Sequence, residues 1–374
     1  MNNSLYPILL LPDVKRVSNA QWDLYRRYEL YGETISHLTH EKVPGLFLIS
    51  GGHSNSFFKS ESAHLIHFGH TARRFQSIKA ARISAKEIKN RDISPTMIIA
   101  GDPFFGLVSS LILRRYLDRK IPIQVSFHGE ITSTGFGKSL KGLLQNLFVR
   151  LSMRRIQSVR LVSSDQVNNA KEIFKVEEKK IVIAPVPIVS SSGEKKELDT
   201  RNKSIAFVGR IHPERGIDTW IETIRNLTSP CSLKIIGDGP LKEEMKRKLL
   251  GFSNHSVSFY GYVTQSELEV QWQSISVLLS TAPYESYGMA MREAILHGIP
   301  VVSIRNSGAT TLFQQCPEMI TLVDNSVDAA RAVEHYLQHP PDASAYRAFQ
   351  NSFFEKQSES LKSLAQTWVG NSIA

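Results

Sequence analysis

The chain has 374 residues, of which 41% are hydrophobic and 21% are charged. Such a composition supplies enough apolar side chains for sizeable cores, so it excludes an intrinsically disordered protein. Two cysteines without a Cys-x-x-Cys pair exclude both a disulfide scaffold and a zinc ribbon. The length predicts two domains of ordinary size, and the low cysteine content is typical of a reducing compartment.

The positive charge is concentrated in the first half of the chain. Residues 1–190 contain 27 Lys and Arg against 15 Asp and Glu, a balance of +12, whereas residues 191–374 have a balance of −2. This asymmetry predicts an anionic partner for the first half, with a membrane surface, a nucleic acid and an acidic substrate as the candidates.

Short apolar runs predict strands along the whole chain. In order, they lie at residues 6–11, 46–50, 64–68, 96–100, 121–127, 159–163, 181–184, 204–208, 232–236, 257–260, 276–280, 299–303 and 320–323. Amphipathic segments of helical length separate most of these runs, which is typical of parallel sheets wound by helices. We therefore predict an α/β protein of two doubly wound, Rossmann-like domains that face a central cleft.

A polar segment from Ser190 to Asp199 predicts where the two domains are joined. We expect a first domain over 1–190, a linker over 191–200 and a second domain over 201–345. Residues 346–374 read as a terminal helix that packs back toward the first domain.

No signal peptide or transmembrane helix is expected. The apolar run from Tyr6 to Leu11 lacks a basic leader, and the longest apolar candidate, Phe104 to Leu113, is shorter than the about 20 residues that span a bilayer. We expect a cytoplasmic protein, with a peripheral position at the inner face of a membrane as an alternative.

The first motif of the second half lies where a strand passes into a helix. The strand 204–208 leads into Gly209 and Arg210, and Arg215 precedes the predicted helix 219–227. Free N–H groups at a helix start bind anions, and two guanidinium groups could grip a diphosphate. A turn with solvated arginines is the structural alternative. A tight turn fully explains Gly237, which follows the next strand, and Pro240 would stand at the first position of the helix after it.

The second motif carries two carboxylates. Glu285 lies in the loop after strand 276–280, Gly288 permits a close backbone approach, and Glu293 lies in the early turns of the next helix. Carboxylates accept hydrogen bonds from vicinal hydroxyls, so the pair is suited to holding a sugar and a ribose. The alternatives are a helix cap for Glu285 and a solvated helix position for Glu293.

These motifs resemble those of the family-4 retaining glycosyltransferases of GT-B architecture, in the family's order and spacing. The matching residues are Gly209-Arg210, Arg215-Gly216, Gly237-Asp-Gly-Pro240, Phe259-Tyr-Gly-Tyr-Val263, the E-x7-E signature from Glu285 to Glu293, and Gly298-Ile-Pro-Val301. The resemblance implies a first domain on the acceptor side and a second domain that binds a nucleotide-sugar donor.

The resemblance also implies roles for single residues. Glu293 would bind the ribose, and Glu285 the transferred sugar. Arg210 and Arg215 would neutralise the diphosphate, together with backbone groups around Gly209 and Gly237. Backbone near Tyr262 and Val263 would bind the base, and the amides of Tyr287, Gly288 and Met289 would face the distal phosphate.

The first half resembles the family more loosely. His128, at the end of strand 121–127, matches a histidine that lies near the donor's sugar and phosphates in the family, although a structural role is an equal alternative. The family's Gly-Gly loop after the first strand is replaced by Leu11 to Ala20. After Pro300 the usual Gly-Gly with a following acidic residue is replaced by Ser307-Gly-Ala-Thr-Thr311. Both departures concern how the donor and acceptor are held.

The segment Lys138 to Arg155 predicts a basic amphipathic helix. Its apolar stripe comprises Leu140, Leu143, Leu144, Leu147 and Leu151, with basic residues on either side. Such helices bind anionic lipid surfaces, and the alternative is a helix that packs into the core with a basic outer face. Nucleic acid is the weaker candidate partner, because no aromatic residues interleave with these cations.

Together these patterns predict a retaining glycosyltransferase that moves a sugar from a nucleoside-diphosphate donor to a hydroxyl of a glycan or a lipid-linked acceptor, in cell-surface polysaccharide or glycolipid biosynthesis. No cofactor and no metal are expected, and the sequence has no Asp-x-Asp tripeptide to hold one. A catalytically weak sugar-nucleotide-binding protein and a nucleotide-sugar epimerase are the alternatives on the same fold.

Overall fold

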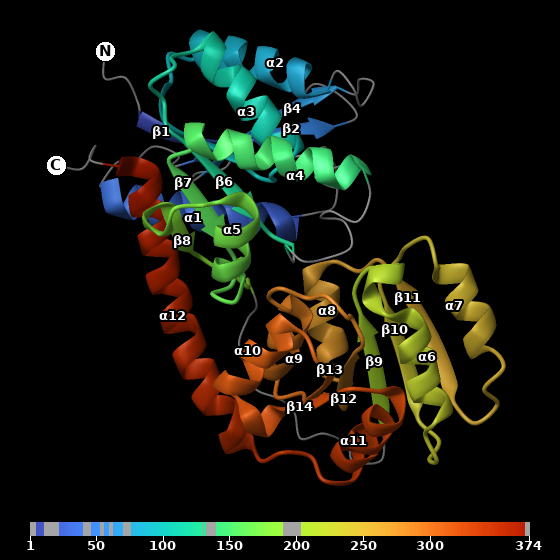
Figure 1. Ribbon diagram of the computed structural model, residues 1–374. Coiled ribbons are helices and arrows are strands. Elements are labelled where there is room, and N and C mark those ends of the chain that lie inside the picture. Colours follow the sequence, from blue (N-terminus) through green and yellow to red (C-terminus); the bar gives the residue numbers. More distant parts are fainter. Residues whose placement is uncertain are drawn as a thin grey trace. The chain divides into compact units, whose positions relative to one another are not determined.

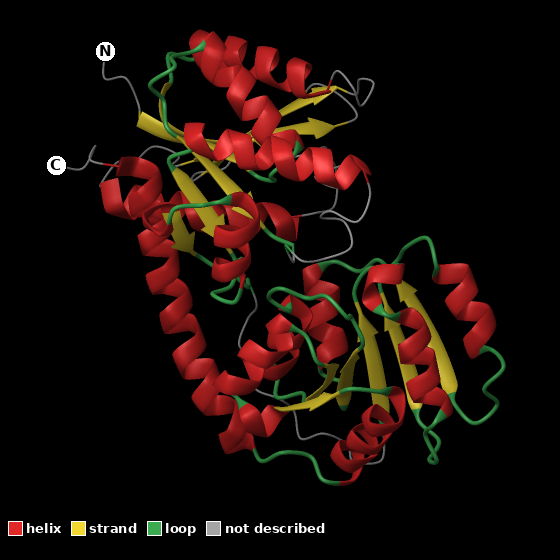
Figure 2. Ribbon diagram, viewed as in Figure 1, coloured by secondary structure: helices red, strands yellow, loops and turns green. Residues whose placement is uncertain are grey.

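In the computed structural model the chain forms two compact α/β units (Figures 1 and 2). Unit 1 comprises residues 1–189 and 357–374, and unit 2 comprises residues 190–356. The structure describes residues 5–10, 22–39, 46–52, 56–59, 63–69, 76–129, 131, 140–189 and 203–370. The predicted linker 191–200, the segment Leu11 to Ala20 and Lys138 lie outside these ranges.

Unit 1 is built on a single sheet. Its strands are β1 (Leu5–Leu10), β2 (Leu46–Gly52), β3 (Ser56–Lys59), β4 (Ala63–Gly69), β5 (Ser94–Ala100), β6 (Ile123–Phe127), β7 (Ser158–Leu161) and β8 (Ile181–Ile183). Their spatial order is β3-β4-β2-β1-β5-β6-β7-β8, and every pairing is parallel except that of β3 with β4. The central strands β6 and β7 are buried along their whole length, because helices cover both faces of the sheet.

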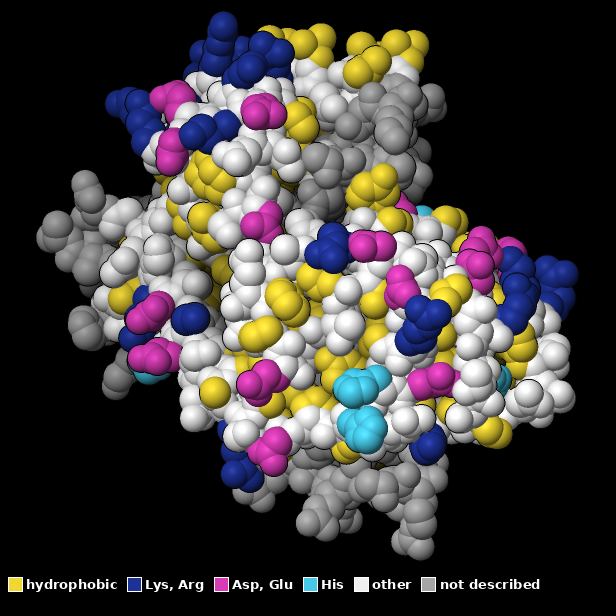
Figure 3. Space-filling model, turned by 60° about the horizontal axis from the view of Figure 1, so that its bottom comes forward, with side chains coloured by type: hydrophobic (Ala, Val, Ile, Leu, Met, Phe, Trp, Pro, Cys, Tyr) yellow, Lys and Arg dark blue, Asp and Glu magenta, His cyan; other side chains and the backbone are white. Residues whose placement is uncertain are grey.

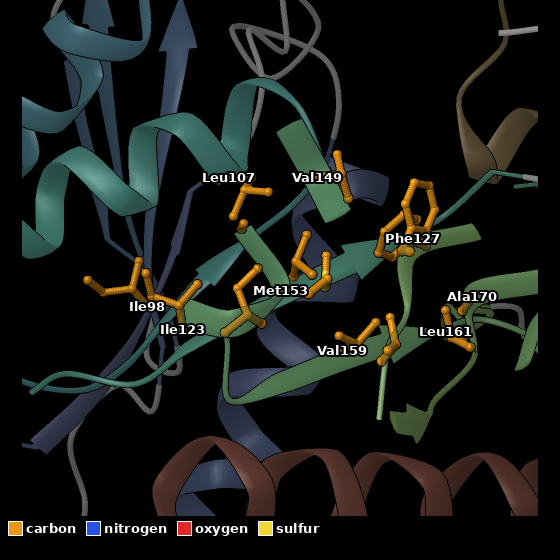
Figure 4. Packing of buried hydrophobic residues seen from close by; sticks show 14 of the residues in the cluster. Ile98, Leu107, Ile123, Phe127, Val149, Met153, Val159, Leu161 and Ala170 are labelled. Atoms are coloured by element: carbon orange, nitrogen blue, oxygen red, sulfur yellow. The ribbon is translucent and has the colours of Figure 1, made fainter. Parts of the chain in front are cut away.

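Helices enclose this sheet from both sides. The helices of unit 1 are α1 (Trp22–Thr39), α2 (Gln76–Asn90), α3 (Phe105–Tyr116), α4 (Leu140–Ser152), α5 (Gln166–Phe174) and the last part of α12 (Ala343–Val369). One core holds side chains from α2 to α5 against β5, β6 and β7, with Leu107, Val149 and Met153 among them (Figure 4). A second core joins α1 and α12 to the other face of the sheet.

Unit 2 repeats this plan with a fully parallel sheet. Its strands are β9 (Ser204–Val208), β10 (Ser232–Ile236), β11 (Ser256–Gly261), β12 (Val277–Ser280), β13 (Val301–Ile304) and β14 (Ile320–Val323). Its helices are α6 (Ile217–Arg225), α7 (Lys242–Leu249), α8 (Gln265–Trp272), α9 (Met289–Leu296), α10 (Ser307–Gln315), α11 (Ser326–Gln338) and the first part of α12. The helices α6, α7 and α11 pack together on one face of the sheet, where Trp220 is fully buried.

The strand order of unit 2 fixes where a ligand can bind. The sheet runs β11-β10-β9-β12-β13-β14, so the chain moves outward from β9 to β11 and then returns to place β12 on the other side of β9. In open parallel sheets, ligands bind outside the carboxyl ends of the strands at such a reversal point. The loops that follow β9 and β12 therefore meet at the position where a binding site is expected.

The predicted α/β class with two wound parallel sheets is confirmed. Strand β3 was not predicted, because its run of two phenylalanines is too short to stand out from its polar surroundings. The predicted strand 46–50 continues through Gly51 and Gly52, which are the last residues of β2. Pro240 does not begin α7, since that helix starts at Lys242 and Pro240 lies in the turn before it.

Candidate functional site

The loop after β12, residues 281–288, is held from two sides. The hydroxyl of Thr281 lies 3.1 Å from the carbonyl oxygen of Arg215 and 2.9 Å from that of Gly216, which ties the loop to the start of α6. On the other side, the side-chain amide of Asn306 donates to the carbonyl oxygen of Ala282 at 2.9 Å. The loops that follow β9, β12 and β13 therefore form one connected unit at the carboxyl edge of the sheet.

The N-terminus of α10 fixes the part of this loop that carries Glu285. The backbone N–H of Gly308 and the hydroxyl of Ser307 donate to the carbonyl oxygen of Glu285 at 2.7 and 3.1 Å. A Cβ atom at Gly308 would lie 2.8 Å from that same oxygen, closer than such atoms pack. The segment that replaces the family's Gly-Gly motif thus supplies a glycine where helix and loop touch backbone to backbone.

Both predicted arginines of the phosphate loop are paired with carboxylates. Arg215 donates from its guanidinium to Glu285, and Arg210 donates to Glu214 at 2.8 Å. The Arg215 and Glu285 side chains are 38% and 19% exposed, whereas about half of the Arg210 and Glu214 side chains is exposed. The structure therefore joins the first motif to the second through the Arg215–Glu285 pair, and it leaves Arg210 in a more open position. The other carboxylate oxygen of Glu285 accepts from the backbone N–H of Tyr287 at 3.5 Å, just before α9 begins, so Glu285 contacts both Arg215 and the start of the helix.

Glu293 occupies a buried position in α9. It is 4% exposed, so the alternative of a solvated helix residue is wrong. Its neighbour Arg292, which sequence reasoning missed, is 2% exposed and lies with its guanidinium carbon 4.0 Å from the centre of the Tyr287 ring. Charged residues are almost never fully buried without partners. Two adjacent buried charges at a sheet's carboxyl edge therefore indicate a built site, and the signal was an Arg-Glu pair inside an otherwise apolar helix.

Gly209 and Gly237 shape the edge beside this loop. The N–H of Gly209 donates to Ile236 at 2.9 Å, and a Cβ atom at Gly237 would lie only 1.8 Å from the carbonyl oxygen of Gly209. With φ at +140°, Gly237 also has a backbone conformation that other residues rarely adopt. Gly237 is therefore required by the packing of two loop backbones, as the turn explanation predicted.

The predicted base-binding residues lie at the end of the edge strand β11. Tyr262 is exposed and Val263 is half-buried, and Thr264 then caps α8 through a capping box with Glu267. Lys242 at the start of α7 approaches the same strand end, with its ammonium nitrogen 3.5 Å from Asp238. These residues belong to unit 2, but the strands β10 and β9 lie between β11 and β12, the strand that precedes Glu285.

The first-half candidates lie in unit 1. His128 follows β6 and is exposed, and the carbonyl oxygen of the adjacent Gly129 accepts a hydrogen bond from Gln166 at 3.2 Å. Partial removal of water from the imidazole by neighbouring atoms, and then the charge of Arg160, hold the pKa of His128 below its usual range. Asp102 caps α3 by accepting from the N–H groups of Phe104 and Gly106, both at 2.8 Å.

The described residues contain neither a metal-binding cluster nor a membrane-spanning helix. Within the part of the chain that the structure describes, no group of three or more His, Cys, Asp or Glu side chains is arranged to hold a metal ion. Among those same residues, no helix combines the length and the apolar character needed to cross a membrane.

Comparison with known families shows which kind of domain carries this site. Residues 202–339 match the model of the family described as glycosyl transferases group 1, and they include the loops after β9, β10, β11 and β12. Unit 2 is a group 1 glycosyltransferase domain. A curated relative of this domain is a GDP-mannose-dependent alpha-(1-6)-phosphatidylinositol dimannoside mannosyltransferase of Mycobacterium tuberculosis, 28% identical over 141 residues, or 36% of each chain. The chain spans less than half of the length of the curated relatives it matches, from 22% to 48%.

Solved structures extend the likeness to both units. Sucrose-phosphate synthase from Thermosynechococcus elongatus has a TM-score of 0.70 at 15% identity, covering 99% of this chain and 96% of that one. HepE of Anabaena, solved in complex with UDP and glucose, has a TM-score of 0.65 at 15% identity, with 96% and 95% coverage. The fold of the group 1 glycosyltransferase domain and of the unit before it is thus that of the GT-B glycosyltransferases.

Proposed function

We propose that the protein is a retaining glycosyltransferase that moves a sugar from a nucleoside-diphosphate-sugar to a hydroxyl group of a glycan or lipid-linked acceptor. The observation that carries this proposal is the site of unit 2, where Arg215 pairs with Glu285 at the strand-order reversal and Glu293 is buried in the helix that follows, inside the segment that matches the group 1 family. We infer that the product belongs to a cell-surface polysaccharide or a glycolipid.

The arginine of this site is suited to the charge that develops in the reaction. When the sugar leaves, negative charge grows on the nucleoside diphosphate, and fixed cations stabilise that charge in the transition state. Arg215 is held in place by Glu285 and by a backbone that Thr281 fixes. Its position is therefore set before the donor binds, so little reorganisation is required when the diphosphate forms.

The two carboxylates are suited to hydroxyl groups rather than to covalent attack. Glu285 is engaged by Arg215, so one of its carboxylate oxygens already has a partner and is less available as a nucleophile. Glu293 is buried within α9, where a carboxylate can accept hydrogen bonds from vicinal hydroxyls. We assign Glu285 to the transferred sugar and Glu293 to the ribose, and His128 of unit 1 to the sugar–phosphate region of the donor.

The test is the release of nucleoside diphosphate from a panel of sugar donors, with glycan and lipid-linked hydroxyl acceptors. We expect turnover with one donor class that requires an acceptor. Arg215→Gln should lower kcat by about 100-fold, because one charge-stabilising donor is lost. Arg331→Gln, an exposed arginine on α11, is the matched control and should leave kcat unchanged.

Four results would contradict the proposal. Nucleotide binding without turnover under any condition would make the protein a binding module. Conversion of the donor without any acceptor would indicate an epimerase. Equal kcat values for Arg215→Gln and the wild type would remove Arg215 from the reaction, and an inverted anomeric product would exclude the retaining assignment.

A further inference from the structure

Helix α4 has two apolar faces, and only one of them is used by the fold. Its inner face carries Val149, which is fully buried in the core of unit 1, and Met153 packs beside it at the end of the helix (Figure 4). Gly142 and Ser152 lie on the same buried side. These contacts already attach α4 to the unit, so the remaining apolar residues are not needed to hold it there.

The outer face of α4 presents leucines to solvent. Leu140, Leu144 and Leu151 are 76%, 60% and 60% exposed, and Leu143 and Leu147 are exposed with them. Of the exposed leucines in the described residues, all but Leu250 belong to this one helix. α4 therefore packs into the core with a basic outer face, as the structural alternative predicted, but it does so through Val149, and its leucine stripe faces solvent.

A groove continues this surface toward α3. It has a volume of about 480 Å³, and its lining comprises Phe104, Val108, Leu140, Leu144, Gln145 and Phe148. Phe104 immediately precedes α3 and ends the Asp102 loop, which follows β5. The apolar surface thus extends from the outer face of α4 to the carboxyl edge of the sheet of unit 1.

The charges carried by residues 140–155 have a single sign. Residues 140–155 include four cations and no acidic residue, and Arg150, Arg154 and Arg155 are exposed. Arg114 at the end of α3 donates to the carbonyl oxygen of Arg155 at 3.0 Å, and its pKa is lowered by desolvation and by the charge of Arg155. Over much of the face drawn in Figure 3, basic and acidic side chains lie close to one another, whereas Lys and Arg gather at its upper left.

We propose that the outer face of α4 binds the surface of an anionic phospholipid bilayer. The leucines and Phe148 enter the apolar layer, and Arg150, Arg154 and Arg155 contact lipid phosphates. A second copy of the chain fits this face less well, because a symmetric contact would bring the same cations of both copies together. Bilayer phosphates, in contrast, neutralise the crowded arginines.

The experiment is co-flotation of the full-length protein with vesicles of phosphatidylglycerol and phosphatidylcholine, compared with vesicles of phosphatidylcholine alone. We expect binding to the anionic vesicles that weakens as salt is raised. The double variant Leu143→Glu, Leu147→Glu should lower the vesicle partition coefficient at least about tenfold, because two leucines lose their apolar environment. Arg150→Glu with Arg154→Glu should abolish the preference for anionic vesicles.

Matched controls are Leu250→Glu and Arg331→Glu, which change equally exposed residues of unit 2 and should bind as the wild type does. Since Leu143, Leu147, Arg150 and Arg154 are all exposed, circular dichroism should show unchanged folding. Wild-type protein that fails to bind anionic vesicles, or leucine variants that bind equally well, would overturn the proposal. Self-association lost in the leucine variants without a change in vesicle binding would assign the face to a second copy. Because no sugar donor is present, the result is separate from that of the transfer assay.

Discussion

Arg292 and Glu293 are far more deeply buried than arginine and glutamate residues usually are. Both are more than nine-tenths buried in α9, and Arg292 lies against the face of Tyr287 in the loop that also carries Glu285. A cation over an aromatic ring is stabilised by the ring's quadrupole, most strongly where water is excluded. This stacking holds the second half of the 281–288 loop, just as Thr281 holds the first half.

Gly308 provides a test of how the loop is held. In Gly308→Ala the new Cβ would lie 2.8 Å from the carbonyl oxygen of Glu285, so helix α10 and the loop must move apart. We expect the free energy of unfolding to fall by about 1–3 kcal/mol, the usual effect of overpacking. Chemical denaturation of the full chain measures it.

The matched control is Gly251→Ala, where the new Cβ would lie at an ordinary 3.6 Å from the carbonyl oxygen of Lys248. Its stability should stay within about 0.5 kcal/mol of the wild type. If the two variants are equally stable, the contact between α10 and the loop does not constrain the site.

For single residues, the sequence predicted which carboxylates lie near the sheet edge better than it predicted which side chains they contact. The spacing of Glu285 and Glu293 located both carboxylates near one sheet edge, because a loop after a strand and the helix that follows it must lie close together. It did not show that Arg215 pairs with Glu285, since the two are 70 residues apart. The burial of Arg292 was equally hidden, because one turn of helix does not show which face is covered.

At the scale of elements, α12 is the one helix divided between the two units: residues up to Lys356 belong to unit 2, and those from Gln357 belong to unit 1. Its end is anchored by Trp368, which is 1% exposed. The indole N–H of Trp368 donates to Gln124 on β6 at 2.7 Å, and its carbonyl oxygen accepts from Thr96 on β5 at 2.8 Å. The anchoring point of α12 is thus the centre of the sheet of unit 1.

Removing this anchor should destabilise unit 1. Trp368→Ala leaves a cavity and removes the donor to the side-chain oxygen of Gln124, so we expect a loss of about 3–5 kcal/mol in the free energy of unfolding. Gln366→Ala, an exposed position on the same turn, should change it by less than about 0.5 kcal/mol. Denaturation curves decide the matter, and a Trp368→Ala protein as stable as the wild type would show that α12 is dispensable.

Elements with strong apolar runs were predictable. The strands of unit 2 lie within two residues of their predicted bounds, because parallel strands covered on both faces are apolar throughout. β3 was missed, since it is a short antiparallel edge strand. The helix 138–155 was predicted, with α4 covering Leu140–Ser152, but which of its apolar faces is buried could be read only from the structure.

At the scale of the whole molecule, the two units carry different charges and different surfaces. Unit 2 holds the candidate donor site, whose cations are paired with carboxylates. Most of the chain's positive charge lies in the first half, which also carries the exposed leucine face of α4. The excess charge is therefore better accounted for by an anionic surface that meets unit 1 than by the diphosphate of a donor.

The central claim is that the carboxyl edge of unit 2 binds a nucleotide-sugar, and calorimetric titration tests it most directly. The full chain is titrated with UDP-, GDP- and ADP-sugars, beside Glu293→Gln and the exposed helix variant Glu222→Gln. We predict that one donor class binds, and that Glu293→Gln weakens its Kd by about 10- to 100-fold through loss of a charged acceptor, with Glu222→Gln unchanged. Wild-type protein that binds none of these donors, or an unaltered Kd in Glu293→Gln, would contradict the account.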